Sequence, residues 1–412
     1  MKHTGIYLHN NNNKQEIIQA VFSNRYQWEL AAGGLLFNDS VIEQIIDEER
    51  RHDKFPVTTA TNKTVGSMSS GEQKKAVLQY LIAQQPGFII LDDWSGNLDV
   101  QNVAALEKII TAAAAHIQII QIFYRRGDVL PFIEQVLTVQ EYKQHLQQNR
   151  ADFLNNPVAL QQLNLEQLPH LFEWITDCDP LVELRHVNVS YNERPILHDI
   201  NWVIRPGEFW QLKGANGSGK TTLVGMIIGD NPKAYGQDIY LFGRKKGSGE
   251  SVWDIKKNIG YFYPAMTLFF TRNDTVENMI SSGLVDSIGL YQLPTEQQQM
   301  TAQQWLQILG PQYQRKRFNE LTPGQQRIVL VIRAIVKLPP LLILDEPTAG
   351  LDDDNTAIFI QLINTLAAMK QMAIIYISHR TEEMIRPGKV LQLVKGNHGS
   401  EALVVEISPA QL

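Results

Sequence analysis

The sequence predicts two α/β domains in one chain, each a parallel sheet wound with helices, the first of them shortened. Two observations lead to this fold class. Short apolar runs such as Phe209–Leu212, Leu341–Leu344 and Ala373–Ile377 have the length of buried parallel strands, and helical segments fall between them. In addition, stretches of the first half return in the second half at a constant distance, which indicates a duplicated domain.

Length and composition fit this organisation. The chain has 412 residues, which suits two domains better than one. Its 44% hydrophobic and 19% charged residues are typical of a globular protein. The formal net charge of -6 argues against wrapping a nucleic acid, because neutralising phosphates needs a surplus of Lys and Arg. We therefore expect a packed enzyme or binding protein and no nucleic-acid partner.

The sequence also indicates a compartment. Cys178 is the single cysteine, so no disulfide can form within the chain, which suits a reducing environment. The polar start, Met1–Asn13, lacks the apolar core of a secretory signal. The longest apolar stretch, Ile109–Tyr124, is interrupted by polar residues, whereas a membrane span needs roughly 20 mostly apolar ones. We expect a cytoplasmic protein that would reach the inner face of the membrane only through a partner.

Two pairs of stretches carry the repeat. Ser69–Gln73 returns as Thr322–Gln326, and Asp92–Asp99 returns as Asp345–Asp352. Both second copies stand 253 positions after the first, since this is the difference between 322 and 69 and between 345 and 92. A repeat of this length is a duplicated domain, because the unit of a solenoid has only about 20 to 50 residues.

The boundary between the copies falls in Glu141–Pro180. This segment is rich in Gln, Asn and Leu and contains three prolines, so it is predicted to form a short helix and a linker. Residues 1–140 are the first predicted domain and residues 181–400 the second. The second opens with a predicted alternating strand, Leu181–Tyr191, and a further strand, Ile196–Ile204, after a turn.

A phosphate-binding loop follows the predicted strand Phe209–Leu212. The segment fits the pattern G-x-x-x-x-G-K-[ST] in full, and its glycines let backbone N–H groups surround phosphates at the start of a helix predicted for Lys220–Ile228. We expect Lys220 to pair with the β and γ phosphates of ATP and Thr221 to ligate Mg²⁺. The predicted ATP-binding residues of this loop are Gly214, Ala215, Asn216, Gly217, Ser218, Gly219, Lys220, Thr221 and Thr222.

Two carboxylates, Asp345 and Glu346, end the next characteristic strand, at the sheet edge where nucleotide sites form. We expect Asp345 to hold Mg²⁺ through water and Glu346 to orient and deprotonate the attacking water. Taken alone, Glu346 could be a surface acid and His379, after a later strand, a structural histidine. Beside a phosphate loop, however, Glu346, His379 and Lys220 are the residues we assign to the catalysis of ATP hydrolysis.

Leu321–Gln325 precedes a helix predicted for Gln326–Lys337 and resembles the L-S-G-G-Q signature of the ATP-binding cassette family. Such a helix start offers N–H donors to a phosphate held by another cassette. The chain resembles the family from Leu181 to about Arg380 and again from Ser67 to Asp99, which implies two P-loop NTPase domains of the ABC ATPase type, the N-terminal one truncated. The predicted signature residues are Ser69, Ser70, Gly71 and Glu72 in the first half and Thr322, Pro323, Gly324 and Gln325 in the second.

A finer resemblance is to the tandem ATPase associated with molybdate transport, also called the photorepair protein. It implies ATP binding and hydrolysis, and a membrane permease supplied in trans. Tyr191 matches the family's adenine-stacking aromatic residue, although an ordinary strand tyrosine would look the same. Pro264 stands where cassettes usually have a Gln that links Mg²⁺ to the membrane partner, which puts the usual coupling in doubt. The similar stretches are Ser190–Leu197, Phe242–Glu250, Trp253–Lys257 and Val285–Gln292.

The first half has no glycine-rich loop. Ile6–His9 leads through four asparagines to Lys14 and a helix predicted for Gln15–Phe22, which is either a remnant of the phosphate loop or a polar tail. If Lys14 corresponds to Lys220, the distance is 206 instead of 253, so 47 residues are missing. We expect most of them to be the helical arm of the cassette.

The catalytic positions of the first half are changed as well. Asp93 stands in place of Glu346, and Tyr124 stands roughly where His379 has its counterpart. A tyrosine cannot replace histidine as a proton switch near neutral pH. The sequence therefore predicts one complete nucleotide site per chain.

In the family, two cassettes face each other head to tail, and each site combines one phosphate loop with the signature of the other cassette. Two arrangements are open for this chain. A monomer can close on itself and place Ser69 against the γ-phosphate, or two chains can form a homodimer that uses Thr322. We favour the first, because the first half keeps a polar signature at a helix start without a phosphate loop of its own.

Two functions remain open on the sequence. One is an ATPase that powers or regulates a membrane transporter, with molybdate as the cargo that the resemblance names. The other is a soluble ATP-driven switch that acts on ribosomes or DNA. Tandem cassettes that act on ribosomes usually carry a long charged arm between the domains, whereas Glu141–Pro180 is short and poor in Lys and Arg, which favours the transporter.

Overall fold

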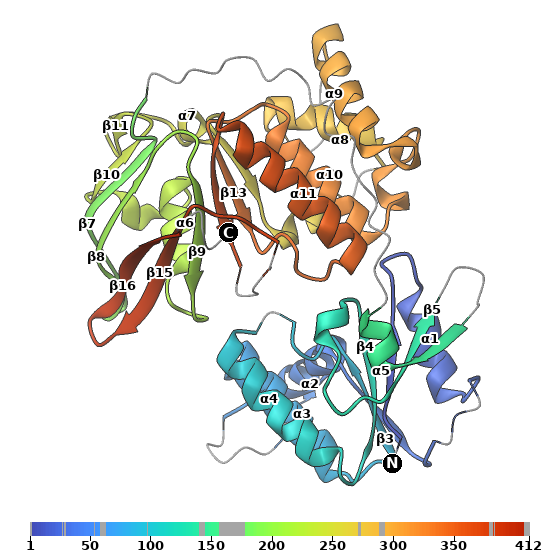
Figure 1. Cartoon of the computed structure of the whole chain (residues 1–412). Coiled ribbons are helices and arrows are strands. Elements are labelled where there is room, and N and C mark those ends of the chain that lie inside the picture. Colours follow the sequence, from blue (N-terminus) through green and yellow to red (C-terminus); the bar gives the residue numbers. More distant parts are fainter. Residues whose placement is uncertain are drawn as a thin grey trace. The chain divides into compact units, whose positions relative to one another are not determined.

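Figure 1 shows the computed structural model of the chain. It describes residues 2–26, 28, 30–52, 54–57, 63–96, 98–139, 145–155, 178–270, 273–287, 293–378, 382 and 384–407. Contacts divide the chain into two compact units, Met1–Ala159 with Gly350–Asp354, and Leu160–Ala349 with Asn355–Leu412. Each unit has a sheet and a hydrophobic core of its own. Among the helices of these ranges, none has the length and apolar character that a membrane span requires.

The first unit is built on a six-stranded sheet with the strand order β2-β3-β4-β1-β5-β6. Five strands run parallel, and β6 pairs antiparallel with β5 at the edge. The strands are β1 (Thr4–Tyr7), β2 (Gly34–Phe37), β3 (Phe88–Asp92), β4 (Gln118–Phe123), β5 (Gln135–Val139) and β6 (His145–Asn149).

Helices cover both faces of this sheet. Side chains alternate along a strand, so Ile89 of β3 enters one core and Ile90 enters the other. Residues of α2, α3 and α4 complete the first core, and residues of α1 complete the second. The helices are α1 (Lys14–Phe22), α2 (Asp39–His52), α3 (Ser70–Ala83), α4 (Val100–Ala113) and α5 (Arg150–Asn155).

The segment predicted as a short helix and a linker does contain a short helix, α5, but this helix and the strand before it belong to the first unit. Residues 145–155 form β6 and α5, and Phe153 of α5 is buried in the core of this unit. The strand β6 has a polar sequence without apolar alternation, so its periodicity gave no signal. The rest of the predicted linker up to residue 177 lies outside the described ranges.

The second unit has a ten-stranded sheet with the order β11-β10-β7-β8-β16-β15-β9-β14-β13-β12. The strands β15, β9, β14, β13 and β12 run parallel, and β7, β8, β10 and β11 pair antiparallel. The strands are β7 (Val182–Tyr191), β8 (Arg194–Ile204), β9 (Phe209–Gly214), β10 (Asp238–Leu241), β11 (Arg244–Lys245), β12 (Ile259–Phe262), β13 (Leu341–Asp345), β14 (Ala373–Ile377), β15 (Lys389–Gly396) and β16 (Gly399–Glu406).

Helices again lie on both faces. Leu223 of α6 belongs to the core between the parallel strands and the antiparallel ones, and Phe359 of α11 packs against Tyr376 of β14 with ring centroids 6.4 Å apart. In α10 the buried Arg333 donates to Ser282 Oγ at 2.9 Å, which ties this helix to α8. The helices are α6 (Lys220–Ile227), α7 (Val252–Lys256), α8 (Val276–Ser282), α9 (Glu296–Leu309), α10 (Pro323–Ile335) and α11 (Asp353–Met369).

The two units share one topology, which confirms the predicted duplication. The order β2-β3-β4-β1-β5-β6 of the first sheet returns as β12-β13-β14-β9-β15-β16 in the second. The turn after β3 and the turn after β13 also match. Asp93 and Glu346 have φ angles of 51° and 45°, and the carbonyl of each accepts a bond of 3.2 Å from the N–H three residues later. Both halves therefore have the same α/β fold, as the predicted duplication requires.

Strand register locates the residues that the first unit lacks. Phe37 of β2 lies opposite Leu91, and Phe262 of β12 lies opposite Leu344, so this strand is offset by 225 positions. The offset between the halves is 206 at Lys14 and Lys220, 225 at this strand and 253 at the carboxylates. Of the 47 missing residues, 19 therefore precede the strand (225 - 206) and 28 follow it (253 - 225). The helical arm thus accounts for 28 only, and the other 19 correspond to the region of β10, β11 and α7.

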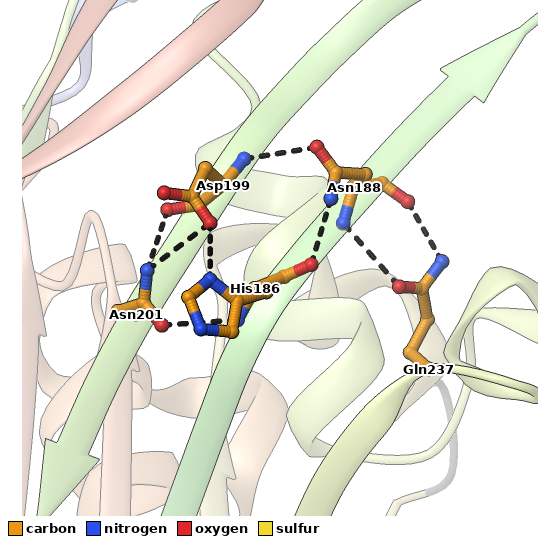
Figure 2. A network of polar contacts seen from close by, with 5 residues as sticks. All are labelled: His186, Asn188, Asp199, Asn201 and Gln237. Carbon is orange, nitrogen blue, oxygen red and sulfur yellow. Dashed lines mark hydrogen bonds and ion pairs between the residues drawn. The ribbon is translucent and has the colours of Figure 1, made fainter.

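A polar network fixes the strand pair that leads to Tyr191 (Figure 2). The pairing of β7 with β8 shifts register three times, and His186 and Asp199 have left-handed φ angles of 49° and 47°. The Asp199 N–H donates to Asn188 Oδ1 at 3.0 Å, and His186 Nδ1 lies 2.6 Å from the Asp199 carboxylate. Side-chain bonds therefore replace the ladder bonds that the shifts remove. The residues of the network are His186, Asn188, Asp199, Asn201 and Gln237.

Candidate nucleotide-binding site

The phosphate loop of the second unit joins β9 to α6, as predicted. Gly217 and Gly219 have left-handed φ angles of 71° and 94°, which residues with a side chain rarely adopt. A Cβ atom on Gly214 would come within 2.4 Å of Ser218 Oγ. That hydroxyl is buried and, in the part of the chain that the structure covers, has no hydrogen-bond partner. Such an orphaned group inside a loop of N–H donors fits a phosphate ligand.

Lys220 begins the helix and curls back over the loop. Its Nζ atom donates to the carbonyls of Gly214 at 2.7 Å and Ala215 at 3.2 Å. The ammonium group therefore already lies where phosphates would enter, held by two neutral acceptors. A phosphate is a stronger partner for an ammonium group than a carbonyl, so the lysine can exchange one for the other.

The two predicted carboxylates lie at the end of β13. Burial, followed by the charge of Glu346, raises the pKa of Asp345 to about 6, although Lys220 acts in the opposite direction. The Glu346 N–H donates to Ile377 O at 2.8 Å, which sets the direction of its strained backbone. Two adjacent carboxylates, one of which raises the pKa of the other, are a place for a hard cation. With Thr221 in the first turn of α6, they supply the oxygen donors that suit Mg²⁺.

Tyr191 is brought to the same site. The residue lies at the end of β7 with 40% of its surface exposed, so its ring is accessible to a base. Asn231 Nδ2 donates to the Tyr191 hydroxyl at 2.9 Å and also reaches Thr222 O at 3.4 Å. One asparagine thus connects the predicted adenine contact to the phosphate loop. Lys233 approaches the same ring, with Nζ 5.7 Å from its centroid.

Sequence reasoning missed Lys395. This residue lies in β15, and its Nζ donates to Asn216 O at the tip of the phosphate loop, at 2.7 Å. No motif marks it, because it comes from a strand about 180 residues further along the chain that pairs with β9. The pairing of β15 with β9 brings a second cation to the loop.

The two signatures have the same local structure. Ser69 caps α3 and Thr322 caps α10, each in a capping box with the residue three positions later. Ser69 Oγ accepts from the Glu72 N–H at 3.5 Å, and Thr322 Oγ1 accepts from the Gln325 N–H at 3.3 Å. Ser70 and Gly71 open α3, and Pro323 and Gly324 open α10. Each signature therefore presents a helix N-terminus, within its own unit.

The strand β12, which leads to Pro264, pairs with β13 and so lies next to the strand that carries the carboxylates. Burial, and after it the charge of Asp345, raises the pKa of Tyr261 in β12. Pro264 then opens a 3₁₀ helix, Pro264–Phe269, because a proline needs no N–H partner in a first turn. This helix presents Leu268 and Phe269, which are 75% and 52% exposed.

In the first unit, the loop after β1 has the place and length of a phosphate loop. Ile6 and Leu212 hold the same position in the strand register and are 206 residues apart, as are Lys14 and Lys220. The conformation differs, however. Asn13 aligns with Gly219 but is extended, with a φ of -79°, and caps α1. Without left-handed residues the loop cannot turn its N–H groups to one centre.

Lys14 takes the cation position of this incomplete site. Its Nζ lies 3.0 Å from Asp92 Oδ2, and the Asp92 side chain is 1% exposed. Asp92 is the counterpart of Asp345, since Asp92 pairs with Ile122 near the end of β4 and Asp345 pairs with Ile377 at the end of β14. In the first unit, a direct ion pair between Lys14 and Asp92 therefore takes the position at which Asp345 is expected to hold Mg²⁺ in the second.

Polar atoms of the same loop contact the segment Gly350–Asp354, which its contacts assign to the first unit. The Asn10 N–H donates to Asp352 Oδ2 at 2.7 Å, and the Asp352 N–H donates to Asn10 Oδ1 at 2.9 Å. His9 Nδ1 lies 3.3 Å from Asp354, and this hydrogen bond raises the pKa of His9. The loop thus binds a peptide segment through its asparagine and histidine.

One predicted catalytic residue, His379, lies outside the described residues. The counterpart in the first unit is better defined. Ile122 lies opposite Asp92, and Tyr124 follows two positions later, as His379 follows Ile377 in the sequence. Burial, and then the charge of Asp92, raises the pKa of Tyr124, so its hydroxyl stays protonated.

Comparison with known proteins gives the family. The sequence model of the family described as ABC transporter matches residues 197–349. The chain is 34% identical over 343 residues to the ABC transporter ATP-binding protein ModF of Escherichia coli (strain K12). The aligned region covers 80% of this chain and 70% of ModF. The chain belongs to the ABC family of ATP-binding proteins. The two units of this ABC protein, which share one strand order, are two cassettes in tandem.

Other relatives agree with this assignment. An uncharacterized ABC transporter ATP-binding protein of Schizosaccharomyces pombe is 31% identical over 324 residues, covering 77% of this ABC protein and 66% of the relative. A chain in the structure of ribosome-bound archaeal Pelota and ABCE1 has a TM-score of 0.61 at 15% identity, covering 98% of this chain and 75% of that one. The last similarity shows a common fold of two cassettes.

We predict that each chain binds one ATP tightly. Lys14→Ala should leave the number of sites and the affinity unchanged, because Lys14 is paired with Asp92 in a loop without left-handed glycines. It should lower the free energy of unfolding by about 1–2 kcal/mol, less than for a fully buried pair because Lys14 is partly exposed. Equilibrium titration and urea unfolding measure both, with Lys14→Arg as the control that keeps the charge. Two equivalent tight sites per chain would contradict the prediction.

Proposed function

We propose that the chain is a Mg²⁺-dependent ATPase in which residues 181–400 form the working cassette and residues 1–140 a cassette without a nucleotide site of its own. The observation that carries this proposal is the proximity of Lys220, Asp345 and Glu346 to a loop whose Ser218 hydroxyl is buried and has no partner among the described residues. Lys220 and the loop N–H groups bind the β and γ phosphates. Tyr191 stacks on the adenine.

The chemistry follows from the same residues. Thr221 and Asp345 would hold Mg²⁺, which supplies positive charge to the phosphates when it is bound. Glu346 orients a water molecule and accepts its proton, since its carboxylate follows directly on the end of β13. We assign His379 to the γ-phosphate from the neighbouring strand, as the sequence places it after β14.

We further propose that the cassettes close within one chain, so that Ser69, Ser70, Gly71 and Glu72 complete the site. The support is local. Ser69 keeps a capping box and an intact helix N-terminus although the first unit lacks a phosphate loop. A homodimer that uses Thr322, Pro323, Gly324 and Gln325 is the alternative arrangement.

For the biological role we propose a cytoplasmic ATPase that acts with a membrane permease in trans. The name of the relative ModF supports a transport role, and molybdate is the cargo that the resemblance suggests. The exposed Leu268 and Phe269, beside the Pro264 position, supply an apolar surface for a partner. The alternative is an ATP-driven switch on ribosomes or DNA, for which the two-cassette fold shared with archaeal ABCE1 is the observation.

We predict that Lys220→Ala abolishes ATP binding, whereas Glu346→Gln keeps ATP bound and lowers turnover by about 10² to 10⁴. The first change removes the cation that pairs with phosphates, and the second removes the base that activates water. Binding and phosphate release are measured separately, with Lys245→Ala and Glu401→Gln as surface controls. Phosphate release near the wild-type rate from Glu346→Gln would remove that residue from its role.

The closing arrangement is tested by two bulky substitutions. With intrachain closure, Ser69→Arg blocks hydrolysis and leaves the first binding of ATP largely intact, because the arginine fills the space of the γ-phosphate at the helix N-terminus. Thr322→Arg then has little effect. Steady-state hydrolysis and ATP affinity of both variants decide the matter. The opposite pattern, in which only Thr322→Arg stops turnover, would establish the homodimer.

The partner is tested on the apolar surface. Leu268→Asp with Phe269→Asp should abolish co-purification of a membrane subunit from detergent-solubilised membranes, because two charges would have to be buried at the interface. ATP hydrolysis by the purified chain should be unchanged. Val404→Asp, at an exposed site of β16, is the matched control. Co-purification of ribosomal proteins in place of a membrane subunit would favour the alternative role.

A further inference from the structure

A pocket of about 340 Å³ in the second unit is separate from the nucleotide site. Its walls come from the β10–β11 hairpin, α7 and the residues just before β12 and β13. Pro340 lines the pocket at the start of β13, whereas Asp345 ends this strand at the nucleotide site. The five residues of β13 span about 16 Å. The pocket therefore lies at the amino end of this strand, and the nucleotide site lies at its carboxyl end.

The floor of the pocket is apolar. Leu241 and Ile255 are each 3% exposed, and Phe242 and Pro340 complete the surface. Phe242 has a left-handed φ of 49°, and its N–H donates to Leu181 O at 2.7 Å. This hydrogen bond holds the backbone bend at Phe242 in place. Strained backbone conformations of this kind are frequent at binding sites. An apolar floor of this size suits the body of a small organic ligand.

Two carboxylates of the lining are already compensated. Glu250 accepts from the N–H groups of Gly247 at 2.7 Å and Ser248 at 2.9 Å, and Lys246 lies 3.4 Å away. Burial acts to raise the pKa of Glu250, but these donors outweigh it and lower the pKa to about 2.

Asp254 is compensated in the same way. Its carboxylate accepts from Ser251 Oγ at 2.8 Å and from Lys257 Nζ at 3.1 Å. These bonds lower the pKa of Asp254 to about 2. Lys257, which also lines the pocket, is thereby paired.

Arg244 is different. It lines the pocket from β11 with its side chain exposed, and within the described ranges no hydrogen bond or ion pair engages its guanidinium group. Of the charged groups around the pocket, this is the one whose charge is left without compensation. A guanidinium group offers a planar fork of donors that matches carboxylate, sulfonate or phosphate oxygens.

We propose that this pocket binds a small amphipathic anion, whose apolar body rests on Leu241, Phe242 and Ile255 and whose acidic group pairs with Arg244. The inference does not depend on the proposed function, since it concerns the edge of the sheet opposite to the nucleotide site. It assigns the second unit a ligand site in addition to that for ATP.

The probe for the test is 1-anilinonaphthalene-8-sulfonate, an aromatic anion whose fluorescence rises in apolar surroundings. Cys178 lines the pocket and is the single cysteine of the chain, so its reaction with the neutral reagent iodoacetamide reports on this place alone. In the full-length protein saturated with Mg²⁺ and ADP, we expect saturable binding of the dye and a slower reaction of Cys178 at the same dye concentrations.

Arg244→Gln should weaken dye binding about ten-fold, since a charge-assisted bond is lost. The matched control is Lys245→Gln, which removes the neighbouring charge but is paired with Asp238 at 2.7 Å and lies outside the pocket lining. It should bind as the wild type does. Arg244→Lys, which keeps the charge without the planar fork, should bind with intermediate affinity and serves if the Gln variant does not fold.

Three results would overturn the proposal. The first is dye binding that occurs only when Mg²⁺ and ADP are left out, which would place the dye at the nucleotide site. The second is an unchanged rate of Cys178 modification at saturating dye. The third is equal dye affinity of Arg244→Gln and Lys245→Gln, which would mean that the guanidinium group is not the partner of the anion.

Discussion

Left-handed backbone at Gly217 and Gly219 is the constraint on which the working site depends. Only with these φ angles does the loop after β9 turn back so that its N–H groups and the start of α6 face one centre. Lys220 then lies over the loop, and its charge acts on the half-buried Asp345 at the end of β13. Strand order brings Lys220 and Asp345 together. The left-handed glycines then direct the loop N–H groups toward one centre, where a phosphate can be bound.

The first unit has the same scaffold without the left-handed backbone in its loop. The strand order, the strand register and the length of the loop are retained, yet Asn13 is extended where Gly219 is left-handed. A buried carboxylate at the end of the strand still needs a cation, because an unpaired charge in the interior is costly. Lys14 supplies it directly, 3.0 Å from Asp92. The first unit therefore compensates the charge of Asp92 with its own lysine side chain, in place of a bound cation.

The second unit has its polar groups at two opposite edges of one sheet. At the carboxyl ends of the parallel strands, Asp345 and Glu346 repel each other and the site is suited to a cation with phosphates. At the amino ends, donors compensate the carboxylates Glu250 and Asp254, whereas Arg244 has no partner among the residues that the structure describes, so that end of the strands is suited to an anion. Regular β13, five residues long, separates the two environments.

The sequence by itself determined the duplicated topology, the phosphate loop, the carboxylates after β13 and the signature caps, because each follows from a local pattern with a fixed φ or capping requirement, as at Gly219 and Ser69. Only the tertiary structure decided that the loop of four asparagines lacks the left-handed turns of Gly217 and Gly219, that the polar segment His145–Asn149 is a strand, and that Lys395 reaches Asn216. Lys395 reaches Asn216 because β15 pairs with β9, a strand about 180 residues earlier in the chain. The polar strand is held by backbone bonds to β5, and the asparagine loop differs because Asn13 is extended and caps α1, so none of the three leaves a periodic trace in the sequence.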